Sequence, residues 1–304
     1  RIALPPDISH TPPPPPHTPE ISDPGAPYPL YAAPQAPPQR RALSLAVGWL
    51  ADRRLPRPLR GPLFRAYARL YSLDLDEVLL PLEEHPSLTA FFIRRLKPGS
   101  RPLDGAPEAL LSPADGRILS AGPLSATDSV SAKGRTFSLS ELTGGLSDSL
   151  AGDGGTAWIV YLSPRDYHRV HAPIDCRLTE IRWLPGARRS VAPAVVARRP
   201  VLAENERCAL RLETDCGPLF MVLVGALNVG RLRVIGQEKG RSGPLASART
   251  FARGEEVGRF ELGSTVVLFA PAGGPTAIPC ETGQPILQGE RIGTFPTLPT
   301  EPAP

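Results

Sequence analysis

Short apolar runs separated by turn residues make up the chain from about Leu110 to Phe295. The runs are about four to nine residues long, and Gly, Pro, Asn and Asp lie between them. Runs of this length between turn residues are typical of strands in an antiparallel domain. The pattern predicts a compact, mostly antiparallel β-domain with strands over Trp158–Leu162, Leu178–Leu184, Cys208–Glu213, Leu219–Leu227, Leu232–Ile235 and Ser264–Phe269.

Proline is concentrated towards the two ends of the chain. Of the 39 prolines, 14 lie in the first 39 residues, including the run Pro12–Pro16, and a smaller cluster lies at Pro296–Pro304. Such segments form neither helix nor sheet and have little to bury, so we expect residues 1–39 and 296–304 to be disordered tails. At 304 residues and 41% hydrophobic, the chain can bury one sizeable core or at most two small ones.

Positive charge gathers between residues 40 and 69, although the whole chain has a net charge of only +4. This stretch contains eight arginines and a single acidic residue, Asp52. They flank the apolar segment Ala42–Leu50, which contains Trp49, and a second pattern in which apolar residues recur at helical spacing. An apolar face rimmed by arginine suits a helix lying among lipid headgroups, but it equally suits an amphipathic helix packed on the core. A nucleic-acid surface is less favoured, because no binding motif accompanies the charge. The residues of the second pattern are Leu63, Tyr67, Leu70 and Tyr71.

The segment after this basic stretch predicts one further short helix. Ser87 can cap a helix that continues through Phe91, Phe92 and Leu96, and Lys97-Pro98-Gly99 then ends it. The predicted fold class is therefore α+β, with a small helical N-terminal part at residues 40–96 and a compact, mostly antiparallel β-domain at residues 97–295.

The four cysteines are irregularly spaced and contain no CxxC motif, so neither a zinc site nor a disulfide framework is indicated. A reducing compartment is the simpler interpretation. No charged segment followed by an apolar one opens the chain, and no apolar run approaches the roughly 18 residues that span a bilayer. We expect a soluble or peripheral protein.

Three groups of residues carry candidate chemistry. Asp115 lies in Ser112–Arg117 on a tight turn just before a strand, although most Asp-Gly pairs are only turns. His168 and His171 lie three residues apart after a predicted strand, where they suit proton transfer. No cysteine or third histidine completes a metal site with the pair, and both rings could simply pack and bond locally.

Ser264 follows Gly263 at the entry to the apolar run that ends near Ala270. A serine hydroxyl attacks a carbonyl only when a base removes its proton, and an Asp-His pair commonly provides and orients that base. Asp115, one of the two histidines and Ser264 would supply these parts.

Five ordered segments resemble the phosphatidylserine decarboxylases, and the likeness runs from about Ala42 to Phe295. The proline-rich N-terminal tail has no recognised counterpart. The segments are Thr89–Pro98, Ser112–Arg117, Tyr161–Pro173, Leu223–Gly230 and Gly258–Val266.

This resemblance implies a proenzyme that breaks its own Gly263–Ser264 peptide bond. Asp115 would orient His171, which would activate Ser264 for attack on the carbonyl of Gly263. β-Elimination would then convert Ser264 into a pyruvoyl group, giving a large chain of residues 1–263 and a small chain of residues 264–304. We expect the two chains to stay together as a heterodimer and to dimerise further.

The resemblance also implies the reaction. The pyruvoyl group would form a Schiff base with phosphatidylserine and accept the electrons released with carbon dioxide, as pyridoxal phosphate does elsewhere. His168 would protonate the product, and hydrolysis would release phosphatidylethanolamine. Neither pyridoxal phosphate, a metal nor a nucleic acid is expected. The lipid substrate favours the membrane interpretation of the basic helices, so residues 40–96 are expected to be a membrane-associating region. The expected location is the cytoplasmic face of the cell membrane, bound peripherally to an anionic surface.

Two alternatives remain at this point. Some enzymes with the same chemistry act on soluble amino acids. An Ala-Asp-Gly turn in a β-rich body is also similar to lipoyl-like carrier domains, which do not process themselves. The combination of Gly263 and Ser264 with Asp115 and His171 separates the enzymes from the carriers.

Overall fold

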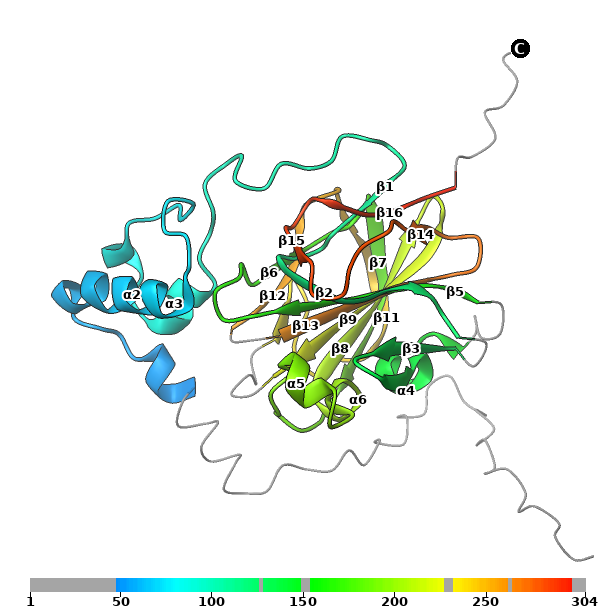
Figure 1. Ribbon diagram of the computed structural model, residues 1–304, viewed down its shortest axis with the longest axis horizontal. Helices are drawn as coiled ribbons and strands as arrows, with labels where there is room; N and C mark the ends of the chain where they lie inside the picture. The colour runs from blue at the N-terminus through cyan, green and yellow to red at the C-terminus, as the bar shows by residue number, and fades with distance from the viewer. Residues whose placement is uncertain (1–47, 126–127, 149–153, 227–231, 262–263, 297–304) are drawn as a thin grey trace, which may run out of the picture. The chain divides into compact units, whose positions relative to one another are not determined.

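An eight-stranded antiparallel sheet forms the centre of the structure, a computed structural model that describes residues 48–125, 128–148, 154–226, 232–261 and 264–296. The strand order is β11-β7-β8-β9-β13-β5-β2-β15 (Figure 1). All described residues belong to the unit Tyr31–Pro304. The strands are β2 (Gly116–Pro123), β5 (Gly155–Leu162), β7 (Cys176–Leu184), β8 (Arg207–Thr214), β9 (Gly217–Gly225), β11 (Gly243–Phe251), β13 (Ser264–Pro271) and β15 (Pro285–Ile286).

Residue alternation along the central strands divides the core between the two faces of this sheet. In β13, Val266 and Leu268 face one buried cluster, and Val267 and Phe269 face the other. Both faces are covered, so the strand is a continuous apolar run rather than an alternating one. On the second face, the rings of Phe220 and Phe269 stack with centroids 4.9 Å apart.

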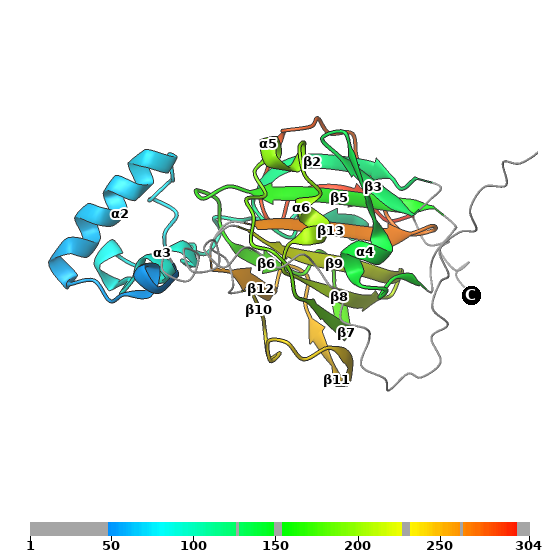
Figure 2. The same ribbon diagram turned by 90° about the horizontal axis from the view of Figure 1, so that it is seen from below.

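Different elements cover the two faces (Figures 1 and 2). Two three-stranded sheets, β10-β12-β6 and β1-β16-β14, bury side chains against the first face. Three short helices and the β3–β4 hairpin cover the second. These elements are β1 (Ala109–Leu111), β3 (Ser129–Ala132), β4 (Arg135–Ser138), β6 (Arg169–His171), β10 (Leu232–Val234), β12 (Glu256–Phe260), β14 (Thr276–Ala277), β16 (Arg291–Thr294), α4 (Leu139–Thr143), α5 (Pro193–Val196) and α6 (Val201–Glu204).

The predicted α+β class is confirmed. Each predicted strand coincides with an observed one, namely β5, β7, β8, β9, β10 or β13, and the ladders between named strands of the described chain are antiparallel. Residues 227–231 and 262–263 lie outside the described residues, and so do the predicted tails except Pro296. The apolar pattern gave no indication of β11, because this edge strand is mostly exposed.

The helical part comprises residues 48–52, α2 (Arg57–Tyr71), the 3-10 turn Leu82–Glu84 and α3 (Leu88–Phe92). Ser87 caps α3 as predicted, since its Oγ accepts a hydrogen bond from Ala90 N at 3.2 Å. The predicted extension of this helix to Leu96 is wrong. The helix ends at Phe92, and Leu96 instead forms an isolated bridge with Val78.

Candidate active site

Ser264 is the first residue of β13 and lies in the middle of the large sheet. It pairs with Leu162 of β5 on one side and Gly225 of β9 on the other. Its side chain shares the face of Val266, so it points into the first core cluster. Ser264 is fully buried, and its hydroxyl has no hydrogen-bond partner among the described residues. Gly263, the predicted partner in cleavage, lies outside the described residues.

His168 ends the loop that leaves β5 directly beside Ser264. The loop is closed by Asp166, whose carboxylate accepts hydrogen bonds from Ser163 N at 2.6 Å and Ser163 Oγ at 2.7 Å. His168 Nδ1 lies 2.8 Å from the carbonyl oxygen of Asp166. Because a carbonyl only accepts, Nδ1 carries the proton and Nε2 keeps its lone pair. This Nε2 is buried with no partner among the described residues, and burial lowers the pKa of His168 to about 3.

His171 lies at the end of β6, and its ring is held by two neighbours. Nδ1 lies 2.8 Å from the carbonyl oxygen of Gly254, and Nε2 lies 3.2 Å from the hydroxyl of Tyr167. Burial lowers the pKa of His171, while the nearby Glu256 and Asp115 carboxylates act in the opposite direction. His171 is therefore a neutral imidazole whose proton lies on Nδ1.

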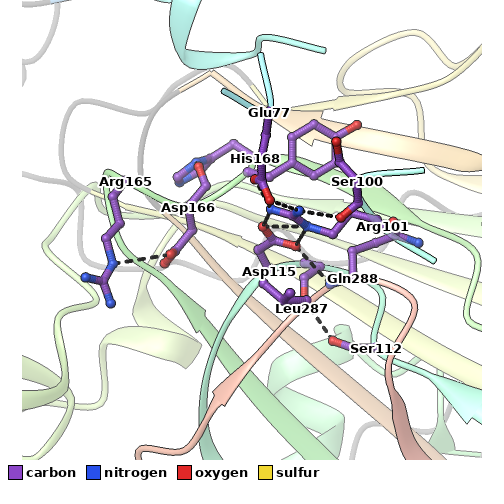
Figure 3. Close-up of polar contacts among 12 residues, drawn as sticks. Glu77, Ser100, Arg101, Ser112, Asp115, Arg165, Asp166, His168, Leu287 and Gln288 are labelled. Carbon is purple, nitrogen blue, oxygen red and sulfur yellow. Dashed lines mark hydrogen bonds and ion pairs between the residues drawn. The ribbon is translucent and has the colours of Figure 1, made fainter. Parts of the chain in front are cut away.

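Asp115 is bound by an arginine that the sequence analysis did not single out (Figure 3). Arg101 Nη2 donates to Asp115 Oδ2 at 2.6 Å, and Arg101 Nε donates to Oδ1 at 2.9 Å. The other side of the same guanidinium bonds both carboxylate oxygens of Glu77 at 2.8 and 2.9 Å. Gln288 N donates to Asp115 Oδ1 at 2.8 Å. Burial alone would lower the pKa of Arg101, but the hydrogen bonds to Asp115 and Glu77 raise it.

Gly116 explains why a glycine follows this aspartate. A Cβ atom at Gly116 would lie 2.3 Å from the carbonyl oxygen of Tyr161 on β5. The glycine therefore permits close packing of β2 on β5, and this packing brings the Asp115 turn to the end of β5. The predicted position of Asp115, on a turn just before a strand, agrees with the structure.

The structure brings the segments that contain Asp115, the two histidines and Ser264 close together, but it shows no hydrogen bonds among their side chains within the described residues. Ser264 follows the end of β12, which pairs with β6, and His168 O accepts from Phe260 N of β12 at 3.0 Å. The Asp115 turn is linked to β6 through His171 N, which donates to Pro113 O at 2.8 Å. Among the described residues, however, neither His171 nor Ser264 is hydrogen bonded to Asp115, and Ser264 is bonded to neither histidine.

Sequence reasoning missed the residues that hold these groups in place. They include Arg101 and Glu77, together with Phe92 at the end of α3 and Arg94 just after it. Arg94 and Phe92 lie within a segment that carried the family resemblance, which was the only available signal. Arg101 lies outside those segments, and its partners are 14 and 24 residues away in the sequence.

A metal-binding cluster and a membrane-spanning helix are both absent from the described part of the chain. No three histidine, cysteine or acidic side chains gather there in a group that could hold a metal ion. None of its helices combines the length and the apolar character needed to cross a bilayer.

Comparison with known proteins identifies the family to which the chain belongs. A family model described as phosphatidylserine decarboxylase matches residues 88–294. Three similar proteins, each named phosphatidylserine decarboxylase proenzyme, come from Alkalilimnicola ehrlichii, Halorhodospira halophila and Marinobacter nauticus. The first is 41% identical over 78% of this chain and 87% of its own length. The second is 41% identical over 83% and 93%, and the third is 39% identical over 86% and 95%.

These matches define an enzyme of the decarboxylase class. The chain belongs to the phosphatidylserine decarboxylase family.

Proposed function

We propose that this enzyme converts phosphatidylserine into phosphatidylethanolamine and carbon dioxide, using a pyruvoyl group that it makes from Ser264. The observation that carries the proposal is the Ser264 hydroxyl, buried and without a hydrogen-bond partner among the described residues, at the first position of a central strand. A buried unbonded hydroxyl costs stability, but it has no hydrogen bond to break before it reacts.

The first step proposed is self-cleavage. His171 Nε2 takes the proton of the Ser264 hydroxyl, and the oxygen attacks the carbonyl carbon of Gly263. The peptide C–N bond breaks, the freed amine takes up the proton, and an ester remains. The Asp115 carboxylate would act on His171 through its charge, which favours the protonated imidazole.

The second step removes the ester. A proton leaves Cα of residue 264 and the ester C–O bond breaks, which gives a carboxylate on Gly263 and a dehydroalanine at 264. Water then replaces the nitrogen as ammonia, and a pyruvoyl group remains. When formed, this group supplies the electron sink for decarboxylation by condensing with the amine of the substrate.

His168 is proposed to move the proton in decarboxylation itself. The substrate amine is an ammonium at neutral pH and must lose a proton before it can react with a carbonyl. His168 Nε2 has a free lone pair with which to take that proton. After carbon dioxide leaves, the same nitrogen can return the proton to carbon.

We further propose that the helical part binds the anionic membrane that contains the substrate. Large apolar side chains are exposed here beside arginines, and Arg53 lies over the ring of Trp49 at 3.7 Å. Part of the predicted apolar face of α2 is exposed, since Leu70 is 76% exposed, whereas Phe64 and Ala68 are buried. Apolar side chains in this arrangement can enter a headgroup layer while arginines meet lipid phosphates. The exposed residues are Trp49, Leu50, Leu59, Leu63, Leu70, Tyr71, Leu79 and Leu80.

The position of β13 supports the proposal that the cleaved chains stay together. Cleavage before Ser264 leaves the strand hydrogen bonded to β5 on one side and to β9 on the other. The small chain would therefore remain as a central strand of the large sheet.

Denaturing gels and mass spectrometry of four variants test the proposal. The parent chain should separate into fragments 1–263 and 264–304, the smaller with a blocked N-terminus, and Ser264→Ala should remain intact. Thr265→Val is the matched control, because Thr265 also has a buried, unbonded hydroxyl but points to the opposite face. It should still cleave. A fresh, folded parent chain that stays intact would contradict self-cleavage.

The two histidines are separated by the same gels and by carbon dioxide release. His171→Ala should remain uncut, whereas His168→Ala should cut but decarboxylate about 10²- to 10⁴-fold more slowly. The opposite pattern would make His168 the base for cleavage and His171 the proton carrier in decarboxylation. The free Nε2 of His168 would also permit that assignment. Release of carbon dioxide from free serine but not from phosphatidylserine vesicles would indicate a soluble substrate.

A further inference from the structure

Two arginines link the segment just after α3 to the loop of residues 163–168, here called the His168 loop. Arg94, only 4% exposed, donates from Nη2 to Arg165 O at 2.8 Å and to Asp166 O at 3.3 Å. In the opposite direction, Arg169 donates from Nε and Nη2 to the carbonyl oxygen of Ile93 at 3.1 and 2.9 Å. Arg94 therefore holds two main-chain carbonyls of the His168 loop, those of Arg165 and Asp166.

One of these carbonyls is the one that orients His168. The oxygen of Asp166 accepts from both Arg94 Nη2 and His168 Nδ1, as its two lone pairs permit. The ring of Phe92, two residues before Arg94, packs on the imidazole with centroids 4.0 Å apart. Arg94 and Phe92 thus contact the two features that define the state of His168, its hydrogen-bond acceptor and its ring face.

Packing alone does not explain a charged residue at position 94. Burial lowers the pKa of Arg94, and its side-chain hydrogen bonds within the described chain go to main-chain carbonyls rather than to a carboxylate. A buried charge is costly to keep, and an apolar side chain of similar size would avoid that cost. The hydrogen bonds that the guanidinium donates to this loop offer a reason for keeping the charge.

We propose that Arg94 is a positioning residue for His168: by holding the carbonyls of Arg165 and Asp166, it keeps the imidazole proton on Nδ1 and leaves Nε2 free to exchange protons. The catalytic part of this inference rests on the proposed role of His168, whereas the part about the tautomer does not. If Arg94 is lost, the Asp166 carbonyl can rotate and the proton can move to Nε2, where it blocks the base.

The tautomer is measured directly by nitrogen NMR of the full chain labelled with ¹⁵N-histidine, with the signal assigned by its loss in His168→Gln. In the parent chain His168 should carry its proton on Nδ1. In Arg94→Gln the Nε2-protonated form should appear, and decarboxylation should fall about 10- to 100-fold, part of the usual contribution of a proton-transfer group. Arg198→Gln, at an exposed position on the β-domain and outside the proposed membrane surface, should behave as the parent chain.

A rescue experiment separates positioning from folding. Arg94→Ala should lose activity, and millimolar guanidinium should restore part of it by donating to the same carbonyls, while Arg94→Lys should remain impaired. A parent chain with the His168 proton on Nε2 would overturn the inference whatever the variants do. A folded Arg94→Gln chain with an unchanged tautomer and a rate within about twofold of the parent would overturn it too. If the tautomer changes but His168→Ala decarboxylates normally, the proposed role of His168 fails and the positioning by Arg94 stands.

Discussion

Acid should destabilise the folded chain between pH 6.5 and 4.5, and His168 should account for a separable part of the loss. The side chain is fully buried, and burial lowers its pKa to about 3. In the unfolded chain the same histidine takes up a proton near pH 6.5. Within this window the unfolded state therefore binds up to one more proton than the folded state. Stability is lost as the pH falls, at up to about 1.4 kcal/mol per pH unit and about 2 kcal/mol over the window.

Urea unfolding at several pH values measures this effect. The Ser264→Ala chain serves as the parent, because an uncut chain gives a simpler unfolding equilibrium. His85 and His171 also have lowered pKa values, but they titrate in both chains and cancel when Ser264→Ala is compared with Ser264→Ala/His168→Leu. The free energy of unfolding of the second chain should depend less steeply on pH, by about 2 kcal/mol over the window, whatever its stability at pH 7.

Equal pH dependence in the two chains would refute this reasoning. It would mean that His168 binds a proton as readily in the folded chain as in the unfolded one. The burial argument would then fail, and so would the neutral Nε2 on which the proposed proton transfer depends.

Three further predictions concern the ion network, the membrane surface and the cofactor. Arg101→Met should lower the free energy of unfolding of the Ser264→Ala chain by about 3 kcal/mol, because it leaves Asp115 buried without its cation. Arg101→Lys keeps a cation and should lower this free energy less, and equal losses for the two variants in urea unfolding would contradict the charge argument. Binding to anionic vesicles in a flotation assay should weaken with added salt and when Arg53, Arg54, Arg57 and Arg60 are changed to Glu, because each cation contributes up to about 1 kcal/mol. The control Arg198→Glu/Arg199→Glu, at an exposed site on the β-domain, should bind normally. Binding that does not depend on salt would contradict the proposed electrostatic attraction to the membrane. Hydroxylamine should abolish carbon dioxide release, whereas chelators should not. Borohydride added with phosphatidylserine should attach the substrate to fragment 264–304, as detected by mass spectrometry. Attachment to the large fragment would refute the proposed cofactor.

The sequence was sufficient for the local features of this fold. Apolar runs such as Trp158–Leu162 predicted strands because a strand buried on both faces must be apolar at successive positions. Ser87 predicted a helix start because its hydroxyl satisfies a backbone N–H of the first turn. The residues proposed for chemistry, Asp115, His168, His171 and Ser264, were also found in the sequence, where ordered motifs gave the family resemblance.

The tertiary structure alone decided which groups surround those residues. Arg101 binds Asp115, and Arg94 shares the Asp166 carbonyl with His168 across 72 residues of sequence. Main-chain carbonyls exist at every position and leave no mark in a sequence, so an arginine that bonds only to them resembles any other arginine until the chain is folded. The exposure of Leu70 was equally hidden, because helical spacing shows that a face is apolar but not whether the core or the surroundings will cover it.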